Sequence, residues 1–246
     1  MEQTDFGFET VPAALKAERV RAVFDSVAPN YDLMNDLMSG GLHRLWKRFA
    51  LGRTGLRPGD FALDVAGGTG DLSAGMARQV GDSGLVCHTD INREMLDRGR
   101  RRLVDAGLFA HVRTLQADAE RLPFADASFH CVMIGFGLRN CTDKPAALRE
   151  MARVIRPGGR LVVLEFSRPA VPLIEPLYDL YSFRILPWLG NVVAGDADSY
   201  RYLAESIRVH PDQETLQGLM VGAGFDAVRY HNLSGGIVAV HLGHRY

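Results

Sequence analysis

The fold is decided between residues 61 and 71, where the chain reads Phe61-Ala62-Leu63-Asp64-Val65-Ala66-Gly67-Gly68-Thr69-Gly70-Asp71. An apolar run interrupted by one acid is typical of a buried strand, and the glycines after it predict a tight turn that opens a helix. Glycine lets a backbone approach a ligand closely, and open α/β folds bind cofactors at the carboxyl edge of the sheet. The stretch therefore predicts a strand, a ligand-binding turn and a helix in succession.

Short apolar runs alternate with helical patterns along the rest of the chain, which is typical of βαβ units and a parallel sheet. We expect an α/β fold with a doubly wound, seven-stranded, mostly parallel sheet. Its helices are predicted over Asp71–Val80, Arg93–Ala106, Lys144–Ile155 and Asp212–Ala223. Its strands are predicted over Phe61–Ala66, Gly84–His88, Val112–Gln116, His130–Gly135, Arg160–Phe166, Phe225–Tyr230 and Gly236–Leu242.

The whole chain, residues 1–246, is expected to form one domain in four stretches. Residues 1–57 read as an N-terminal helical cap of two or three helices, and 58–166 as the cofactor-binding core. The proline- and aromatic-rich residues 167–211 read as a substrate-side helical insertion, because so long a connection is usually a lid or a pocket wall. Residues 212–246 supply the last helix and two strands.

Composition excludes several classes of protein. The 28 Lys and Arg balance 29 Asp and Glu, so no basic field is available for nucleic acid, and we expect no such partner. Three cysteines without ligand spacing, and His241 and His244 read as terminal surface residues, predict no metal site. Without a targeting segment or a spanning apolar run, we expect a cytoplasmic protein.

The glycine spacing discriminates between cofactors. A dinucleotide fingerprint requires Gly or Ala where this chain has Ser73. Asp64 instead resembles the acidic start of the class I methyltransferase motif D/E-x-G-x-G-x-G, with Ala66 replacing its first glycine, and this resemblance implies S-adenosylmethionine (SAM) bound at Gly67, Gly68, Thr69 and Gly70. A nicotinamide or flavin cofactor, or a turn without a ligand, are the alternatives.

Two further acids fit the same cofactor. Asp90 follows the second predicted strand, where a carboxylate accepts hydrogen bonds from a ribose diol. Asp118 and Ala119 follow the third strand, where methyltransferases of this class contact the adenine ring, so the resemblance implies that role here. A helix cap or a loop acid is the alternative for Asp118.

Longer strings outside the cofactor motif identify a narrower resemblance. The chain resembles the ubiquinone/menaquinone biosynthesis C-methyltransferase family from near residue 5 to its C-terminus. Gly135 departs from the family, which often has Ser there. The matching strings are Asp5–Phe8, Tyr31–Ser39, His43–Arg48, Ala66–Asp71, Phe136–Asn140, Leu164–Ser167 and Asp196–Ile207.

The resemblance implies transfer of the SAM methyl group to a ring carbon of a polyprenylated quinol. The implied acceptors are demethylmenaquinol, a naphthoquinol that becomes menaquinol, and 2-polyprenyl-6-methoxy-1,4-benzoquinol, which becomes its 5-methyl product. Three rival functions are weighed against it: methylation of another small acceptor, a non-catalytic scaffold within a quinone-biosynthesis complex, and a nicotinamide oxidoreductase.

Such a reaction needs an acceptor carbon made electron-rich by loss of a phenolic proton. We expect Arg139 to stabilise the phenolate and Asn140 to orient it, since an arginine is a poor base; a structural ion pair is the alternative for Arg139. His43 is a candidate base because its ordinary pKa suits proton transfer at neutral pH. Tyr31 and Asp32 are candidates for the cap over the cofactor.

The isoprenoid tail of such an acceptor lies in a membrane. Two apolar stretches are candidates for its channel or for a peripheral contact at the inner face of the membrane, with ordinary core packing as the alternative. They are the stripe Met34, Leu37, Met38, Leu42, Leu45 and Trp46, and the insertion Val171–Leu189.

Overall fold

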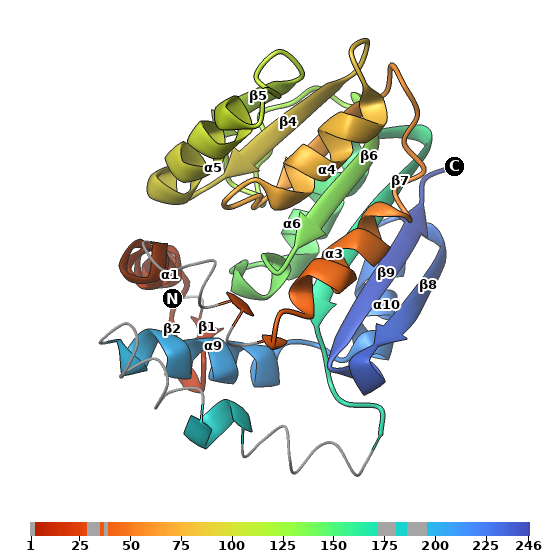
Figure 1. Cartoon of the computed structure of the whole chain (residues 1–246). Coiled ribbons are helices and arrows are strands. Elements are labelled where there is room, and N and C mark those ends of the chain that lie inside the picture. Colours follow the sequence, from red (N-terminus) through yellow and green to blue (C-terminus); the bar gives the residue numbers. More distant parts are fainter. Residues whose placement is uncertain (1–2, 29–34, 37–38, 172–180, 186–195) are drawn as a thin grey trace.

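The computed structural model describes residues 3–28, 35–36, 39–171, 181–185 and 196–246. Its centre is a seven-stranded sheet with helices on both faces, which confirms the expected doubly wound α/β fold (Figure 1). The strands lie in the order β5-β4-β3-β6-β7-β9-β8, and all pairs are parallel except those that β9 makes with β7 and β8. They are β3 Phe61–Val65, β4 Leu85–Asp90, β5 Val112–Gln116, β6 Phe129–Gly135, β7 Ile155–Phe166, β8 Asp226–Leu233 and β9 Val238–His244.

Helices cover the two faces in separate groups. α3, α4 and α5 pack on one face, and α6 and α10 pack on the other (Figure 1). The described helices are α1 Ala13–Val27, α3 His43–Leu51, α4 Asp71–Val80, α5 Arg93–Asp105, α6 Lys144–Val154, α9 Ala197–Val209 and α10 Gln213–Gly222, with short helical turns η2 Leu138–Asn140, η3 Tyr181–Ile185 and η4 Ser234–Gly236.

Side-chain alternation along the central strands builds the core. In β3, Ala62 packs with the α3–α5 layer while Leu63 and Val65 pack with the α6–α10 layer. Val162 and Val163 of β7 divide between the layers in the same way. Successive residues of a strand face opposite sides, so a strand covered on both sides is mostly apolar, and its few buried charged residues, such as Asp64 and Glu165, have polar partners.

The start of β7 differs from the sequence-based prediction. The strand begins at Ile155, five residues before the predicted Arg160. Phe129 pairs with Ile155 and Cys131 with Arg160, so residues 156–159 bulge out of the ladder, with Gly158 at φ +81°. The segment with Gly158 and Gly159 is therefore an interruption within a longer strand.

The N-terminal stretch begins with a hairpin, where only helices were predicted. β1 (Gln3–Phe6) pairs antiparallel with β2 (Glu9–Pro12). The Phe6 ring stacks on Tyr202 of α9 with centroids 4.2 Å apart. The Phe8 backbone N–H donates to the Glu205 carboxylate at 3.2 Å. Because these partners lie in α9, the local sequence could not reveal the hairpin.

Several sequence predictions fall on residues outside the described part of the chain. Tyr31, Asp32, Met34, Leu37 and Met38 are among them, as is most of the Val171–Leu189 insertion. Within the described residues, no helix is long and apolar enough to cross a membrane.

Candidate functional site

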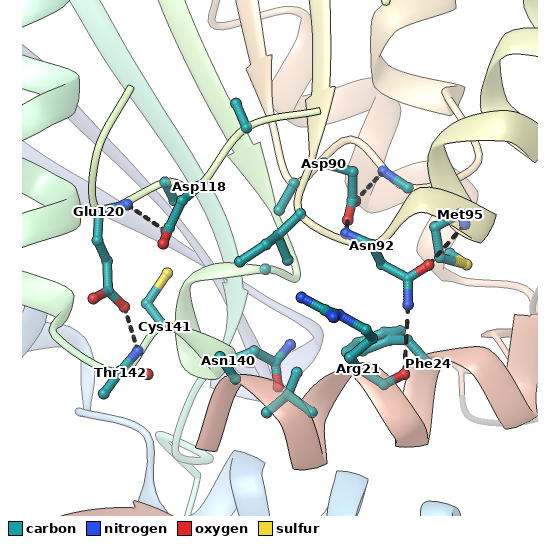
Figure 2. Close-up of a pocket in the computed structure, with 18 of the residues that line it drawn as sticks. Arg21, Phe24, Asp90, Asn92, Met95, Asp118, Glu120, Asn140, Cys141 and Thr142 are labelled. Carbon is teal, nitrogen blue, oxygen red and sulfur yellow. Dashed lines mark hydrogen bonds between the residues drawn. The ribbon is translucent and has the colours of Figure 1, made fainter. Parts of the chain in front are cut away.

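A cavity of about 300 Å³ lies at the carboxyl ends of the parallel strands. In the sheet, β4 and β5 lie on one side of β3, and β6 and β7 lie on the other. The cavity opens at this change of direction, which is where open α/β sheets bind ligands. The residues that line it follow β3, β4, β5 and β6, and one wall comes from α1 (Figures 1 and 2).

The glycine turn after β3 is held from beneath by a buried polar cluster. Asp64 is fully buried, and its carboxylate accepts a hydrogen bond from the Ser73 hydroxyl at 2.6 Å. Ser73 is also 2.9 Å from the His88 ring. A side chain at Gly67 would collide with that ring and with the Asp64 carboxylate. Asp64 and Gly67 therefore shape the turn and do not line the cavity.

The rest of the turn presents its backbone to the cavity or starts the helix. Gly68 lines the cavity at φ +54°, and Gly70 caps α4 at φ +83°. Thr69 is buried outside the lining. Ala66 lines the cavity at φ +51°, a left-handed conformation that normally favours glycine. Ala66, which stands where the methyltransferase motif has its first glycine, therefore keeps the left-handed backbone conformation and is strained by it.

Asp90 ends β4 and connects the turn to the start of α5. One carboxylate oxygen accepts from the Gly68 backbone N–H at 2.9 Å and the other from the Asn92 N–H at 2.8 Å. Burial raises the pKa of Asp90, while these two hydrogen bonds act in the opposite direction. Each oxygen keeps a second lone pair, so the group can also accept hydrogen bonds from a diol.

The loop after β5 forms the opposite side of the cavity (Figure 2). Asp118 and Ala119 both line it, and the Asp118 carboxylate accepts from the Glu120 N–H at 2.9 Å. Glu120 in turn accepts from the N–H groups of Thr142 at 2.6 Å and Asp143 at 3.0 Å. Burial raises the pKa of Glu120.

Helix α1 closes the cavity, although none of its residues was predicted to contact the cofactor. Ala13, Ala17, Val20 and Phe24 line it at spacings of three and four residues, so they share one helix face. The helix is held to α5 because the Asn92 side chain donates to Asp25 at 2.7 Å and caps α5 through Met95. The sequence feature that could have indicated this lining was the row of apolar residues at helical spacing, which begins with two alanines.

Asn140 and Arg139 lie in different environments although they are neighbours. Asn140 lines the cavity, and its side-chain oxygen accepts from the Tyr202 hydroxyl at 3.1 Å. The Arg139 guanidinium is buried outside the lining, where it pairs with Glu165 at 2.9 Å and donates to the Phe136 carbonyl. Arg139 thus forms the ion pair that was the alternative for it, and stabilisation of a phenolate by its guanidinium stays a prediction.

The histidines also occupy positions that the sequence did not reveal. His43 is buried, lies outside the cavity lining, and its Nε2 is 2.8 Å from Asp36. His241 was expected at the surface but is buried in β9, 2.9 Å from the Gln213 carbonyl, because β9 is an inner strand of the sheet. Among the described residues, no three His, Cys, Asp or Glu side chains gather as a metal site.

A family model described as the ubiE/COQ5 methyltransferase family matches residues 13–245. The chain belongs to the ubiE/COQ5 methyltransferase family. A protein of Teredinibacter turnerae is 62% identical over 240 residues, covering 98% of this chain and 96% of the relative. One of Paraburkholderia phymatum is 59% identical over 246 residues and covers all of both chains. Each is named ubiquinone/menaquinone biosynthesis C-methyltransferase UbiE.

Solved structures support the fold of this ubiE/COQ5 family member. A SAM-dependent methyltransferase from Thermotoga maritima has a TM-score of 0.62 at 19% identity, covering 92% of this chain and 99% of that one. Another from Aquifex aeolicus has a TM-score of 0.58 at 18% identity, covering 80% and 88%. The chain is a SAM-dependent methyltransferase, and SAM is its methyl donor.

The cavity fits this donor. Gly68, without a side chain, leaves the space beside Asp90 open, and a Cβ there would lie 3.3 Å from Met95. Asp90 offers acceptors for hydroxyl groups, while Ile91, Met95 and Ala119 supply apolar contacts for a planar ring. Of the eight predicted cofactor residues, Gly68, Asp90, Asp118 and Ala119 thus line the cavity, and the other four shape the turn.

Proposed function

We propose that this chain transfers the methyl group of SAM to a ring carbon of a polyprenylated quinol in ubiquinone and menaquinone biosynthesis. The acceptors are demethylmenaquinol, which gives menaquinol, and 2-polyprenyl-6-methoxy-1,4-benzoquinol, which gives its 5-methyl product. The observation that carries the proposal is full-length identity near 60% to proteins with that name, extending through the substrate-side residues as well as the donor cavity.

On the donor side, bound SAM supplies an electrophilic methyl group. The chain therefore needs to bind and orient the two substrates and to exclude water, and it need not provide a nucleophile. Asp90 accepts hydrogen bonds from the ribose hydroxyls, and Asp118 with the Ala119 backbone binds the adenine. The glycine turn brings its backbone against the donor, and Asp64 holds that turn from beneath.

On the acceptor side, we propose that Asn140 touches the substrate. Its carboxamide lines the cavity, and with its oxygen bound to Tyr202 its N–H₂ group is free to donate to a phenolic oxygen. Arg139 acts as a positioning residue, because its ion pair with Glu165 fixes the η2 turn that carries Asn140. We do not propose His43 as the base, because it lies outside the lining of the cavity in which the acceptor would react.

The test is a methyl-transfer assay with labelled SAM and two reduced acceptors, a short-chain demethylmenaquinol and a short-chain methoxy-benzoquinol. Label is expected in both quinols and in neither oxidised quinone, because only the reduced ring has an ionisable phenol that enriches its carbon. Label in one quinol alone restricts the enzyme to that pathway. SAM binding without transfer to either quinol would contradict the proposal and favour another acceptor or a scaffold.

We also propose a peripheral membrane contact through the exposed side of α3. Leu42 and Leu45 of the predicted stripe are 42% and 62% exposed, whereas Trp46 is buried in the core. Arg44 and Arg48 are exposed beside them, so apolar and cationic side chains share this surface. Membership of a quinone-biosynthesis complex stays a prediction from the resemblance.

Flotation with vesicles that contain an anionic lipid tests the membrane contact. The wild-type chain is expected to float with the vesicles, and Leu45→Glu is expected to reduce the bound fraction several-fold. Val221→Glu, an exposed apolar residue on α10, is the matched control and should float like wild type. Wild-type protein that stays in the soluble fraction would remove the proposal.

A further inference from the structure

The described lining of the cavity contains three carboxylates and a single cation. The carboxylates are those of Asp90, Asp118 and Glu120, and the cation is the guanidinium of Arg21 on α1. Figure 2 shows the Arg21 side chain directed from its helix into the cavity, between Asn92 on one side and Asn140 on the other.

The three carboxylates are already engaged by the protein backbone. Asp90 accepts from two N–H groups, Asp118 from one and Glu120 from two. The Arg21 guanidinium, by contrast, forms no hydrogen bond or ion pair with any part of the chain that the structure describes. A guanidinium is always charged and carries five donors, so one directed into a cavity without a partner is suited to an anionic ligand group.

The backbone of Arg21 is held in place, although its side chain has no partner in the described part of the chain. The Asn92 carboxamide donates to the Arg21 carbonyl at 3.4 Å and to the Asp25 carboxylate at 2.7 Å. Asn92 also caps α5, and its own N–H is bound to Asp90. The position of Arg21 is therefore set by the same group of residues that holds the proposed ribose-binding carboxylate.

SAM has one anionic group, the carboxylate of its methionine part. The proposed function assigns Asp118 and Ala119 to the adenine and Asp90 to the ribose, which leaves Arg21 as the cation available to that carboxylate. We propose that Arg21 binds the methionine carboxylate of SAM, with the fork of the guanidinium matching its two oxygens. This inference rests on the proposed use of the cavity for SAM.

The test is calorimetric binding of SAM and of decarboxylated SAM, which keeps the adenosine, sulfonium and amine but lacks the carboxylate. Both ligands are titrated into wild type, Arg21→Gln and Arg101→Gln. Arg101 is the matched control because it shares a neighbouring surface hollow with Arg21 but does not line the cavity. Arg21 lies on an exposed helix surface, and thermal melting of each variant verifies its folding.

Wild type is expected to bind SAM at least about ten-fold more tightly than decarboxylated SAM, since hydrogen bonds between charged groups contribute roughly 1.5–3 kcal/mol. In Arg21→Gln this preference should fall towards one through weaker SAM binding alone, and in Arg101→Gln it should persist. An undiminished preference in Arg21→Gln, or no preference in wild type that binds SAM, overturns the inference. Wild type that binds neither ligand overturns the use of the cavity for SAM itself.

Discussion

Arg139 and Glu165 form a buried ion pair, with side chains 4% and 1% exposed. Removing one member of such a pair leaves an uncompensated charge in the core and typically costs about 3–5 kcal/mol. Arg139→Met should therefore lower the free energy of unfolding by this amount in urea denaturation. The double variant Arg139→Met/Glu165→Gln should recover a large part of the loss. Equal stability of the single and double variants would show that the pair is not coupled.

Tyr202 is the partner that orients Asn140. Burial raises the pKa of Tyr202 to about 12, so its hydroxyl remains a donor at neutral pH. Tyr202→Phe should lower kcat by roughly three- to ten-fold, corresponding to the loss of one hydrogen bond, and leave the Kd for SAM unchanged. Tyr200→Phe is the control on the same helix, because the Tyr200 hydroxyl has no hydrogen-bond partner among the residues that the structure describes. Equal effects of the two variants would contradict an orienting role.

Lys16 connects α1 to two other elements. Its ammonium is buried and donates to the Cys141 carbonyl at 3.1 Å and to the Thr4 hydroxyl at 3.5 Å. Burial, together with the nearby charge of Lys144, lowers the pKa of Lys16 to about 8. The folded protein therefore binds this proton less tightly than the unfolded chain does.

The lowered pKa of Lys16 determines whether the stability of the protein rises or falls with pH. Between about pH 8 and pH 10.5 the unfolded chain retains the proton that the folded protein has lost, so stability rises with pH in that window. Relative to Lys16→Met, wild type should gain up to about 3.5 kcal/mol across it, at about 1.4 kcal/mol per pKa unit. Denaturation at several pH values measures the difference, with Lys47→Met as the control. A parallel pH dependence in wild type and Lys16→Met would contradict the shift.

The parallel strands were predictable because each one carries its own local signal. Phe61–Val65 is apolar except for Asp64 and is followed by a glycine-rich turn, so its position could be predicted from the local sequence. The β1–β2 hairpin is different, since Phe6 is stabilised by Tyr202 and the Gly7 turn lies against Glu205. Elements that depend on partners far along the chain are not visible in a local pattern.

In the candidate site, too, some residues could be placed from the local sequence and others could not. Asp90 and Asp118 follow strands and could be placed at the sheet edge from their positions alone. The environment of Arg139 could not, because its partner Glu165 lies 26 residues later in β7. One sequence feature did indicate such a pair: Glu165 lies within the apolar run at residues 161–166, and a buried charge there requires a partner.

At the scale of the whole molecule, the donor cavity joins the N-terminal helix to the sheet. A ligand that contacts α1 as well as the loops after β3, β4 and β5 binds the folded state alone and stabilises it. SAM at 100 times its Kd should add about 2.7 kcal/mol, which corresponds to a rise in Tm of roughly 5–10 °C for a chain of this size. Thermal melting checks this, and NAD or FAD at the same concentration should give no shift. A shift with either dinucleotide would instead support the alternative cofactor.

The hydrogen bond from the Phe8 backbone to Glu205 spans 197 residues, and it bears on how the protein is made. The ribosome releases the hairpin first, yet its partners Tyr202 and Glu205 emerge only with α9. Contacts between segments so distant in sequence form late, after shorter loops have closed. The hairpin that precedes α1 should therefore be the last of these elements to reach its place, and a nascent chain should gain its full affinity for SAM only near the end of translation.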